Sequence, residues 1–544
     1  MRVNGKLQLV PYMRIVLCFI CGIVAGWYID GVATAVWLAV SALSLAVAFA
    51  VPAGKRLRPG MPMEVAKGGM ILLTVFCLGG LRMALERDSM TVKLPPTTTA
   101  YQAVVVSPPI EKEKIVMCDL KVLRGPDIDK PLLVKASFLK PEYNRTRLPE
   151  VPPFYYKNLI LKSQISNLKL HVGDGMEVFS TLTEPTNFIE SDFDYALFLK
   201  RRGFAATTFI PADSWLPQQV SLEPLSYIER TRIGALRLRQ RISDRYRNLG
   251  IGGQELAVLS AMTVGDKSLL DAETKELYSA TGASHVLALS GLHLGIIYSI
   301  LTLLTIGGRW RRVSQVLILL AIWTYVVMVG LSLSVVRSAL MLTVFSFAAM
   351  LGRNNFSVNS LSVSALVMLG INPNNLFDVG FQMSFMAVLS ILVLYKDIYG
   401  WLPERWLSHK AVSWAWGMAA VSIAAQIGVA PLIAYYFHRL SMYFLPVNYI
   451  VVPAATVILY CAVLFLFCWP LLPVQALLAK ILSFVVSLLN AFLERVAAWP
   501  HASIDDLYPT LLQVFCLYVF IAAMYVVLHY LALAWRYSRV EGFV

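Results

Sequence analysis

Residues 443–469 read Y-F-L-P-V-N-Y-I-V-V-P-A-A-T-V-I-L-Y-C-A-V-L-F-L-F-C-W and contain no Asp, Glu, Lys or Arg. As a helix, this stretch is longer than the roughly 20 residues that cross a bilayer. The rest of the chain shares its character, since 57% of the 544 residues are apolar and only 15% are charged, against about 45–50% and about 25% in soluble domains. This excess excludes an ordinary soluble enzyme and predicts that a lipid bilayer surrounds most of the chain.

Apolar stretches of this kind predict a polytopic α-helical membrane protein of about twelve spans. The stretches are residues 12–28, 32–52, 68–84, 284–306, 313–331, 334–351, 357–371, 377–396, 411–437, 443–469, 475–498 and 510–535. Three of them form an expected N-terminal membrane unit at 1–97, and the other nine form a second membrane domain at 283–544. Between these two parts we expect an inserted β-domain at 98–220 and amphipathic helices at the membrane surface at 221–282.

The basic residues of the connecting loops predict the orientation, because short loops rich in Lys and Arg stay in the cytoplasm. If twelve spans are counted, all of these loops fall on one side of the membrane. Their basic residues are Arg2, Lys6, Arg14, Lys55, Arg56, Arg58, Lys67, Arg309, Arg311, Arg312, Arg353, Lys396, Arg405, Lys410, Arg536 and Arg539. We therefore expect both termini in the cytoplasm and residues 98–220 on the extracytoplasmic side.

The inserted segment contains short β-rich runs, such as Y-Q-A-V-V-V (101–106) and L-L-V-K-A-S-F-L (132–139), separated by Gly and Pro. About five such strands predict a small β-barrel or sandwich, for which an OB-like barrel is one candidate. The segment carries 15 basic and 14 acidic residues, which weakens its interpretation as an electrostatic trap for nucleic acid. Several of its aromatic rings could stack on bases, although core packing explains such residues more often. They are Phe154, Tyr155, Tyr156, Phe188, Phe193, Tyr195 and Phe198.

Residues 228–249 read I-E-R-T-R-I-G-A-L-R-L-R-Q-R-I-S-D-R-Y-R-N-L, an amphipathic helical pattern with seven arginines. Two interpretations stay open. The helix either lies on lipid headgroups or attracts a polyanion outside the membrane. The residues that would carry either role are Arg237, Arg239, Arg241 and Arg245.

Polar side chains inside apolar spans are costly, so they usually have a partner or mark a pathway. The run S-H-V-L-A-L-S-G-L-H-L-G (284–295) predicts a broken helix at Ser290–Gly291. Arg337 needs an anion, and Asp378 is the partner that we predict for it. The candidate substrate-pathway residues are His285, Ser290, Gly291, His293, Arg337, Asp378, Gln382, Ser384, Gln426 and Asn448. Buried bonds that only fix helix packing are the competing interpretation.

The sequence carries no pattern for nucleotide or metal chemistry. It has no G-x-x-x-x-G-K-[ST] loop, no H-E-x-x-H and no paired cysteine motif, and its seven cysteines and seven histidines are scattered. We therefore expect no catalytic residue, no metal site and no cofactor. The driving force for any transport would come from a gradient or from partners.

Four stretches give the chain a resemblance to a known family. They are L-S-A-M-T-V-G-D-K-S (259–268) with H-V-L-A-L-S-G-L-H-L-G (285–295), V-R-S-A-L-M (336–341), N-P-N-N-L-F-D-V-G-F-Q-M-S-F (372–385), and A-Q-I-G-V-A-P-L with P-V-N-Y-I-V-V-P (425–453). In order and spacing they resemble the ComEC family of competence proteins, in a form that lacks the C-terminal metallo-β-lactamase-like domain. Residues 186–199 are similar to the end of the family's OB-like domain.

The resemblance implies a multi-pass channel of the bacterial inner membrane that translocates single-stranded DNA into the cytoplasm during natural transformation, without being an enzyme. It implies single-stranded DNA and membrane lipid as partners, together with a DNA receptor on the outer face and a cytosolic helicase or single-strand-binding protein, and it allows a homo-oligomer. Two alternatives stay open. One is a transporter of another anionic polymer or lipid, which the near-neutral insert favours. The other is an intramembrane hydrolase that uses His285, His293 and Asp378.

Overall fold

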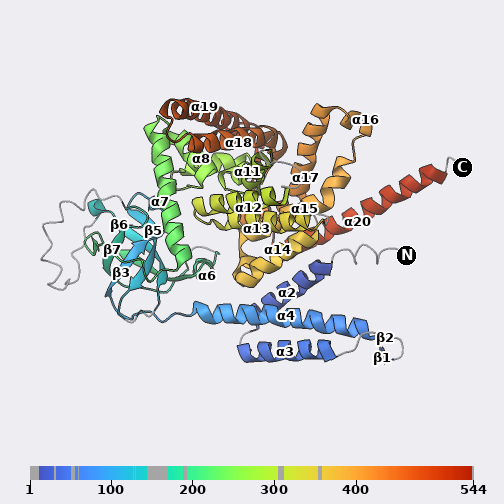
Figure 1. Ribbon diagram of the computed structural model, residues 1–544, viewed down its shortest axis with the longest axis horizontal. Coiled ribbons are helices and arrows are strands. Elements are labelled where there is room, and N and C mark those ends of the chain that lie inside the picture. The colour runs from blue at the N-terminus through green and yellow to red at the C-terminus, as the bar shows by residue number, and fades with distance from the viewer. Residues whose placement is uncertain are drawn as a thin grey trace.

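The computed structural model describes most of the chain and consists of helices with one sheet at an end of the helical body (Figure 1). The described residues are 11–29, 32–50, 56–58, 61–126, 128, 130–143, 170–187, 193–303, 311–352 and 358–541. Three of the aromatic residues expected in the insert, Phe154, Tyr155 and Tyr156, lie outside these ranges, and so does Phe188.

The N-terminal unit is built on close helix packing. Its elements are α2 (Pro11–Tyr28), α3 (Thr34–Ala50) and α4 (Met63–Met90), with a short hairpin of β1 (Arg56–Arg58) and β2 (Met61–Pro62) before α4. A Cβ atom on Gly22 would lie 1.9 Å from the carbonyl oxygen of Phe76, and one on Gly26 would lie 2.7 Å from that of Gly80. Small residues let helix backbones approach this closely in membranes, so these glycines fix the α2–α4 contact.

The insert forms one sheet in which buried and half-buried residues alternate along several strands. The strands are β3 (Thr99–Val105), β4 (Ile110–Glu111), β5 (Ile115–Arg124), β6 (Leu132–Leu139), β7 (Gly175–Ser180), β8 (Phe204–Ile210) and β9 (Trp215–Pro217). Their order is β8-β6-β5-β3-β7-β9, with β4 beside β5, and only the β6–β8 pair is parallel. The inner face buries Tyr101, Leu120, Val134 and Met176, as period-two alternation requires.

The expected closed barrel is not present in the described part of the chain. The ends of β7 and β8 are joined by an isolated bridge between Thr183 and Thr207 and by hydroxyl hydrogen bonds, such as the 2.7 Å bond between Ser180 and Thr208, but not by a ladder. The reason is that β9 occupies the free edge of β7, with Met176 opposite Pro217. A strand paired on both edges cannot also form a ladder with β8, so the sheet stays open.

Short helices connect the sheet to the membrane helices. They are α6 (Tyr195–Arg201), α7 (Tyr227–Asn248), α8 (Gly253–Val264), α9 (Ala272–Ala280) and α10 (Ser284–Leu287). A capping box starts α7, because the Ser226 hydroxyl accepts from the Glu229 N–H while the Glu229 carboxylate accepts from the Ser226 N–H. In Figure 1, α7 runs crosswise between the sheet and the membrane helices.

The second membrane domain consists mostly of apolar helices of different lengths. They are α11 (Gly291–Leu303), α12 (Arg311–Met328), α13 (Leu333–Met350), α14 (Val358–Ile371), α15 (Val379–Tyr399), α17 (Lys410–Phe437), α18 (Phe444–Phe467), α19 (Leu472–Ala497) and α20 (Leu511–Glu541). Shorter elements between them are η4 (Pro373–Phe377), α16 (Glu404–Leu407) and the paired strands β10 (Leu440–Ser441) and β11 (Ser503–Ile504). Residues of α8, α18 and α19, with others from α7, α9 and α10, share one buried apolar cluster.

Every predicted span coincides with a helix, but twelve full spans are not confirmed. Among the described residues, eight helices are long and apolar enough to cross a membrane. Four apolar helices are shorter, namely Thr34–Ala50, Gly291–Leu303, Arg312–Met328 and Val358–Ile371. The stretch at 284–306 is short because the predicted break is present, with α10 ending at Leu287 and α11 starting at Gly291.

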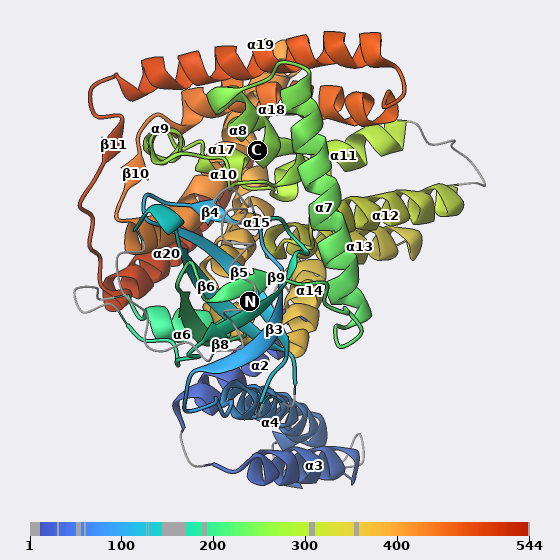
Figure 2. The same ribbon diagram turned by 90° about the vertical axis from the view of Figure 1, so that its left-hand side faces the viewer.

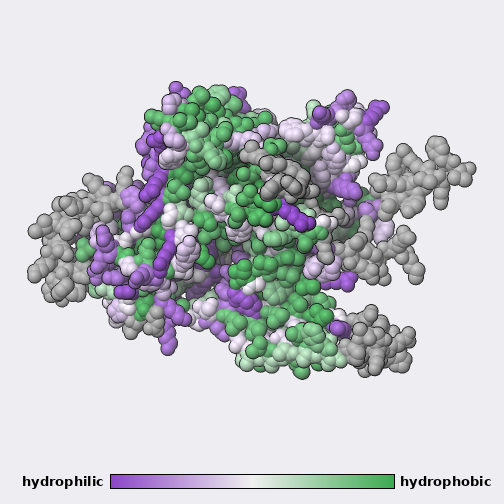
Figure 3. Space-filling model, viewed as in Figure 1, coloured by the Kyte–Doolittle hydropathy of each residue, from purple (hydrophilic) through white to green (hydrophobic). Residues whose placement is uncertain are grey.

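The outer surface of the helices is apolar. Figure 3 shows hydrophobic residues spread over the helical body, whereas hydrophilic ones gather around the sheet and, at the opposite end, over α16 and the start of α17. Large side chains such as Phe484 and Leu488 of α19 are exposed there. Water does not tolerate apolar surface on this scale, so the chain is a multi-pass membrane protein. A view along the sheet end, in Figure 2, places the N-terminal helices α2–α4 together on one side of this body.

Candidate functional site

The candidate site centres on Asp378, which begins α15 directly after the N-P-N-N-L-F turn. Its Oδ1 accepts a 2.8 Å hydrogen bond from the backbone N–H of Phe381, the usual role of an N-cap aspartate. The same oxygen accepts a 3.1 Å bond from Nη1 of Arg337 on α13. The ion pair predicted from the sequence is therefore present.

Arg337 is more deeply buried than its partner. Its side chain is 6% exposed, against 21% for Asp378, and its Nε has no hydrogen-bond partner among the described residues. Gly380 makes room for the guanidinium, because a Cβ atom there would lie 2.7 Å from Nη2 of Arg337. A larger residue in place of this glycine would push the guanidinium aside.

A second chain of bonds extends the site from Gln382 to α17. The Tyr436 hydroxyl donates to Oε1 of Gln382 over 2.9 Å, and Nε2 of Gln382 donates to the carbonyl of Leu376 over 2.9 Å. Gln382 was expected from the sequence, but Tyr436 was not. Its only sequence signal is a hydroxyl near the end of an apolar span.

The insert reaches the same site through two arginines at the end of α6. Nη2 of Arg202 lies 3.9 Å from Oδ2 of Asp378, and the guanidinium of Arg201 lies 4.1 Å from the ring centre of Phe377 and 4.6 Å from that of Trp27. Burial lowers the pKa of Arg201, while the nearby Tyr28, Asp194 and Tyr436 raise it. The guanidinium nonetheless stays charged, as arginine does in proteins.

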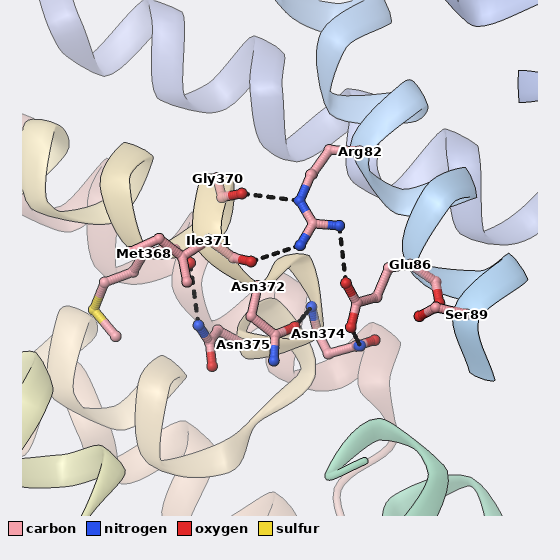
Figure 4. Close-up of polar contacts among 9 residues, drawn as sticks. All are labelled: Arg82, Glu86, Ser89, Met368, Gly370, Ile371, Asn372, Asn374 and Asn375. Atoms are coloured by element: carbon pink, nitrogen blue, oxygen red, sulfur yellow. Dashed lines mark hydrogen bonds and ion pairs between the residues drawn. The ribbon is translucent and has the colours of Figure 1, made fainter. Parts of the chain in front are cut away.

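The N-terminal unit meets the N-P-N-N motif through α4, as Figure 4 shows. Nε of Arg82 donates to the carbonyl of Gly370 over 2.9 Å, and its Nη2 donates to that of Ile371 over 2.5 Å. These carbonyls end α14, where unpaired backbone acceptors need partners. Nη1 of Arg82 binds Glu86 at 2.8 Å, and Nδ2 of Asn374 donates to the same carboxylate over 3.4 Å. Asp378 therefore lies where all three parts of the chain meet.

The two histidines predicted for the pathway make no hydrogen bond to this site among the described residues. His293 is fully buried, and its Nδ1 accepts from the backbone N–H of Ser290 over 3.3 Å, which leaves its buried Nε2 without a partner among described groups. His285 is exposed, with Nδ1 3.1 Å from the carbonyl of Gly282. Among the described residues, no hydrogen bond or ion pair joins His285, His293 and Asp378, the three side chains of the hydrolase hypothesis.

The remaining predicted residues lie elsewhere in the bundle. Nδ2 of Asn448 donates to the Ser422 hydroxyl over 3.2 Å, between α18 and α17. Ser384 is half-buried on α15, and Gln426 is half-buried on α17. Gly291 begins α11, and a Cβ atom added to it would lie 3.3 Å from the hydroxyl oxygen of Ser338. The sequence prediction thus combined one connected site with several separate positions.

Three of the four arginines singled out on the basic helix make polar contacts within the chain. Arg237 donates to the carbonyls of Val172 and Gly173, Arg239 is buried against Asp266 at 3.4 Å, and Arg245 donates to Gln475. Arg241 is exposed.

The apolar face of α7 is also occupied. Ile233 and Leu236 pack under the sheet, and Ile242 and Tyr246 pack with the membrane helices. This face is not free to lie on lipid, because the helix joins the sheet to the membrane domain. Burial lowers the pKa of Arg239, and Asp266 opposes this shift.

A cleft of about 660 Å³ lies between the rim of the sheet and α7. Its charged lining mixes both signs, including Lys140, Glu142, Arg239, Asp244 and Asp266. This balance gives no preference for a polyanion. The described residues hold no group of three or more His, Cys, Asp or Glu side chains that could bind a metal ion.

Comparison with known proteins assigns the second membrane domain. The family model described as "Competence protein" matches residues 262–531. This domain belongs to the competence protein family. The matched range contains Arg337, Asp378, Gln382 and Tyr436, and the resemblance inferred from the sequence motifs is confirmed.

Curated relatives agree with this assignment. The chain is 31% identical to ComE operon protein 3 of Bacillus subtilis over 288 residues, which are 52% of this chain and 34% of that protein. It is 24% identical to Recombination protein 2 of Haemophilus influenzae over 232 residues, 39% of this chain and 28% of that protein. The chain thus covers about a third of the length of these competence-family relatives. No solved structure matches it.

Proposed function

We propose that the chain is an inner-membrane conduit through which single-stranded DNA enters the cytoplasm during natural transformation. Membership of the competence family supports a role in DNA uptake. The observation that carries the proposal is the Arg337–Asp378 pair, because a charged pair inside apolar helices is costly and usually marks a pathway. Asp378 is also approached by a second arginine, Arg202, which belongs to the inserted domain.

The path begins at the insert and passes the Asp378 site. Arg337, Asp378, Gln382 and Tyr436 offer donors and acceptors at the junction of α13, α15 and α17. His293, with its unpaired buried Nε2, lies on α11, which packs against α13. A conduit for a polar strand needs such groups to replace water, but it cannot bind so tightly that the strand stays.

The proposed orientation places both termini in the cytoplasm and residues 98–220 outside. In Figure 1 the sheet lies at one end of the helices and the far end of α20 at the other, which supports this orientation. An alkaline phosphatase fusion after Lys140 tests it. The fusion is expected to be active, and an inactive but well-expressed fusion contradicts the assignment.

Partners follow from the same proposal. A DNA receptor on the outer face would deliver the strand to the insert, and a cytosolic helicase or single-strand-binding protein would draw it inward. The near-neutral insert favours a second candidate function, the transport of another anionic polymer or lipid.

Uptake of labelled DNA by a deletion strain separates these functions. The proposal predicts that a strain without this chain binds DNA at its surface but internalises no nuclease-protected strand. Complementation with the wild-type gene restores uptake. Normal internalisation by the deletion strain contradicts the proposal and favours the transport of another polymer.

A further inference from the structure

Positive charge exceeds negative charge where the insert touches the membrane domain. Arg202 and Arg337 contact different oxygens of one carboxylate, that of Asp378, at 3.9 and 3.1 Å. Arg201 contacts the rings of Trp27 and Phe377, and Asp194 is the further carboxylate that acts on it. Among the described residues, three guanidinium groups thus face two carboxylates, which leaves the cluster with one net positive charge.

The guanidinium groups also have unused hydrogen-bonding capacity. Arg337 uses Nη1 for Asp378, while its Nε is buried without a partner among the residues described, and Nε of Arg201 is in the same position. A guanidinium carries five N–H donors in a planar fork that suits carboxylate or phosphate oxygens. The cluster is therefore built to bind more acceptor oxygens than one aspartate supplies.

Asp378 can break its bond to Arg337 and still keep a hydrogen-bond partner. Its Oδ1 also accepts the backbone N–H of Phe381, so the carboxylate keeps a partner as the N-cap of α15. It is 21% exposed, whereas Arg337 is 6% exposed. Any anion that takes its place must bring its own negative charge to the buried arginine.

We propose that Arg202 and Arg337 form a binding site for a phosphodiester group of the substrate strand, which Asp378 occupies until the strand displaces it. This inference rests on the proposed DNA-conduit function. A phosphodiester carries the same single negative charge as the carboxylate, so each arginine keeps an anionic partner after the exchange. Arg202, with a side chain 49% exposed, meets the phosphate first, and Arg337 receives it next. Arg201 positions Arg202 by holding the end of α6 against Trp27 and Phe377.

The test measures binding of fluorescent oligothymidylate to the purified full-length chain in a phospholipid-free detergent, over a range of salt concentrations. Arg202→Gln is expected to weaken binding about tenfold, as for one lost charge-assisted hydrogen bond. It should also lower the salt slope by about 0.7, the value for one phosphate contact on a single strand. Asp378→Asn keeps the cap and removes the competing charge, so it should tighten binding.

Lys200→Gln is the matched control, because Lys200 is on the same helix but pairs with Glu184 at 2.9 Å. It removes the same charge and is expected to leave the binding and the salt slope unchanged. Equal effects of Arg202→Gln and Lys200→Gln overturn the site, since binding would then depend on net charge alone. Weaker binding by Asp378→Asn, or no binding by the wild-type chain, also overturns it.

Two further readouts separate the sources of phosphate and the two proposals. If phosphatidylglycerol stabilises the wild-type chain but not Arg202→Gln, and oligothymidylate binding is the same for both, the site binds lipid headgroups and the inference is wrong. If the binding results are as expected but a deletion strain takes up DNA normally, the site stands and the transport function fails. If uptake needs the chain but binding ignores Arg202, the function stands and the site fails.

Discussion

The Arg337–Asp378 pair allows a double-mutant test in which the two single variants should differ. After Asp378→Ala, Arg337 keeps a 6% exposed charge with no carboxylate, and α15 loses its N-cap. After Arg337→Ala, Asp378 still has the Phe381 N–H and Arg202. The first change should therefore cost more stability than the second.

The expected magnitudes follow from burial. Removing one partner of a buried ion pair costs about 3–5 kcal/mol, and loss of an N-cap adds about 1 kcal/mol, so Asp378→Ala should approach this range. Arg337→Ala should cost about 1–3 kcal/mol, since its partner is half-satisfied and partly exposed. The double variant should cost less than the two single costs together, with a coupling of at least about 1 kcal/mol.

The assay combines thermal unfolding of the purified chain in detergent with transformation frequency and membrane abundance. Both single variants are expected to abolish transformation. The double variant should recover membrane abundance, because it leaves no unpaired charge in the bundle. It should not recover transformation, because both pathway side chains are missing. Arg405→Ala, an exposed arginine on α16, is the control and should behave as wild type.

Two results would refute this reasoning. Additive stability costs would show that the two side chains do not interact in the membrane. A double variant that transforms normally would show that the pair only fixes helix packing.

Three other outcomes follow from the packing of the described residues. Gly22→Leu should destabilise the N-terminal unit by more than about 1–3 kcal/mol, the usual cost of overpacking, because the new side chain would clash with the backbone of α4. Gly68→Leu is the control, since its side chain would enter open space, and it should leave thermal unfolding unchanged. Arg239→Gln should lower the melting temperature by leaving its buried carboxylate partner unpaired, while Arg241→Gln, at an exposed position, should change stability by no more than about 0.5 kcal/mol. Burial raises the pKa of the Cys118 thiol to about 12, so a maleimide at neutral pH should label it only after denaturation, and rapid labelling of the native chain would contradict its placement in the sheet.

The helices and the central ion pair could be predicted from the sequence because both depend on local chemistry. Apolar length predicts a helix wherever a bilayer is the solvent, and two opposite charges in one bundle are expected to pair. The break before Gly291 was predictable for the same reason, since Ser-Gly in an apolar run favours an interrupted helix.

The rest of the site depends on how distant parts of the chain dock. Arg82, Arg201 and Arg202 look like ordinary arginines near helix ends, and no periodicity distinguishes them from surface residues. The open sheet depends on three residues, Trp215–Pro217, that pair with β7 in place of β8. The contacts of the α7 arginines could not be predicted because an amphipathic pattern shows that one face is buried but not what covers it.

The most direct test of the conduit is photocrosslinking to DNA in transit. p-Benzoylphenylalanine at position 384, a half-buried candidate pathway position on α15, should crosslink to an incoming labelled strand during uptake. The same residue at position 484, on the exposed apolar face of α19, should not. A strand that crosslinks at 384 and not at 484 is the predicted result. Normal uptake with no crosslink at 384, or equal crosslinking at both positions, would contradict a path through this site.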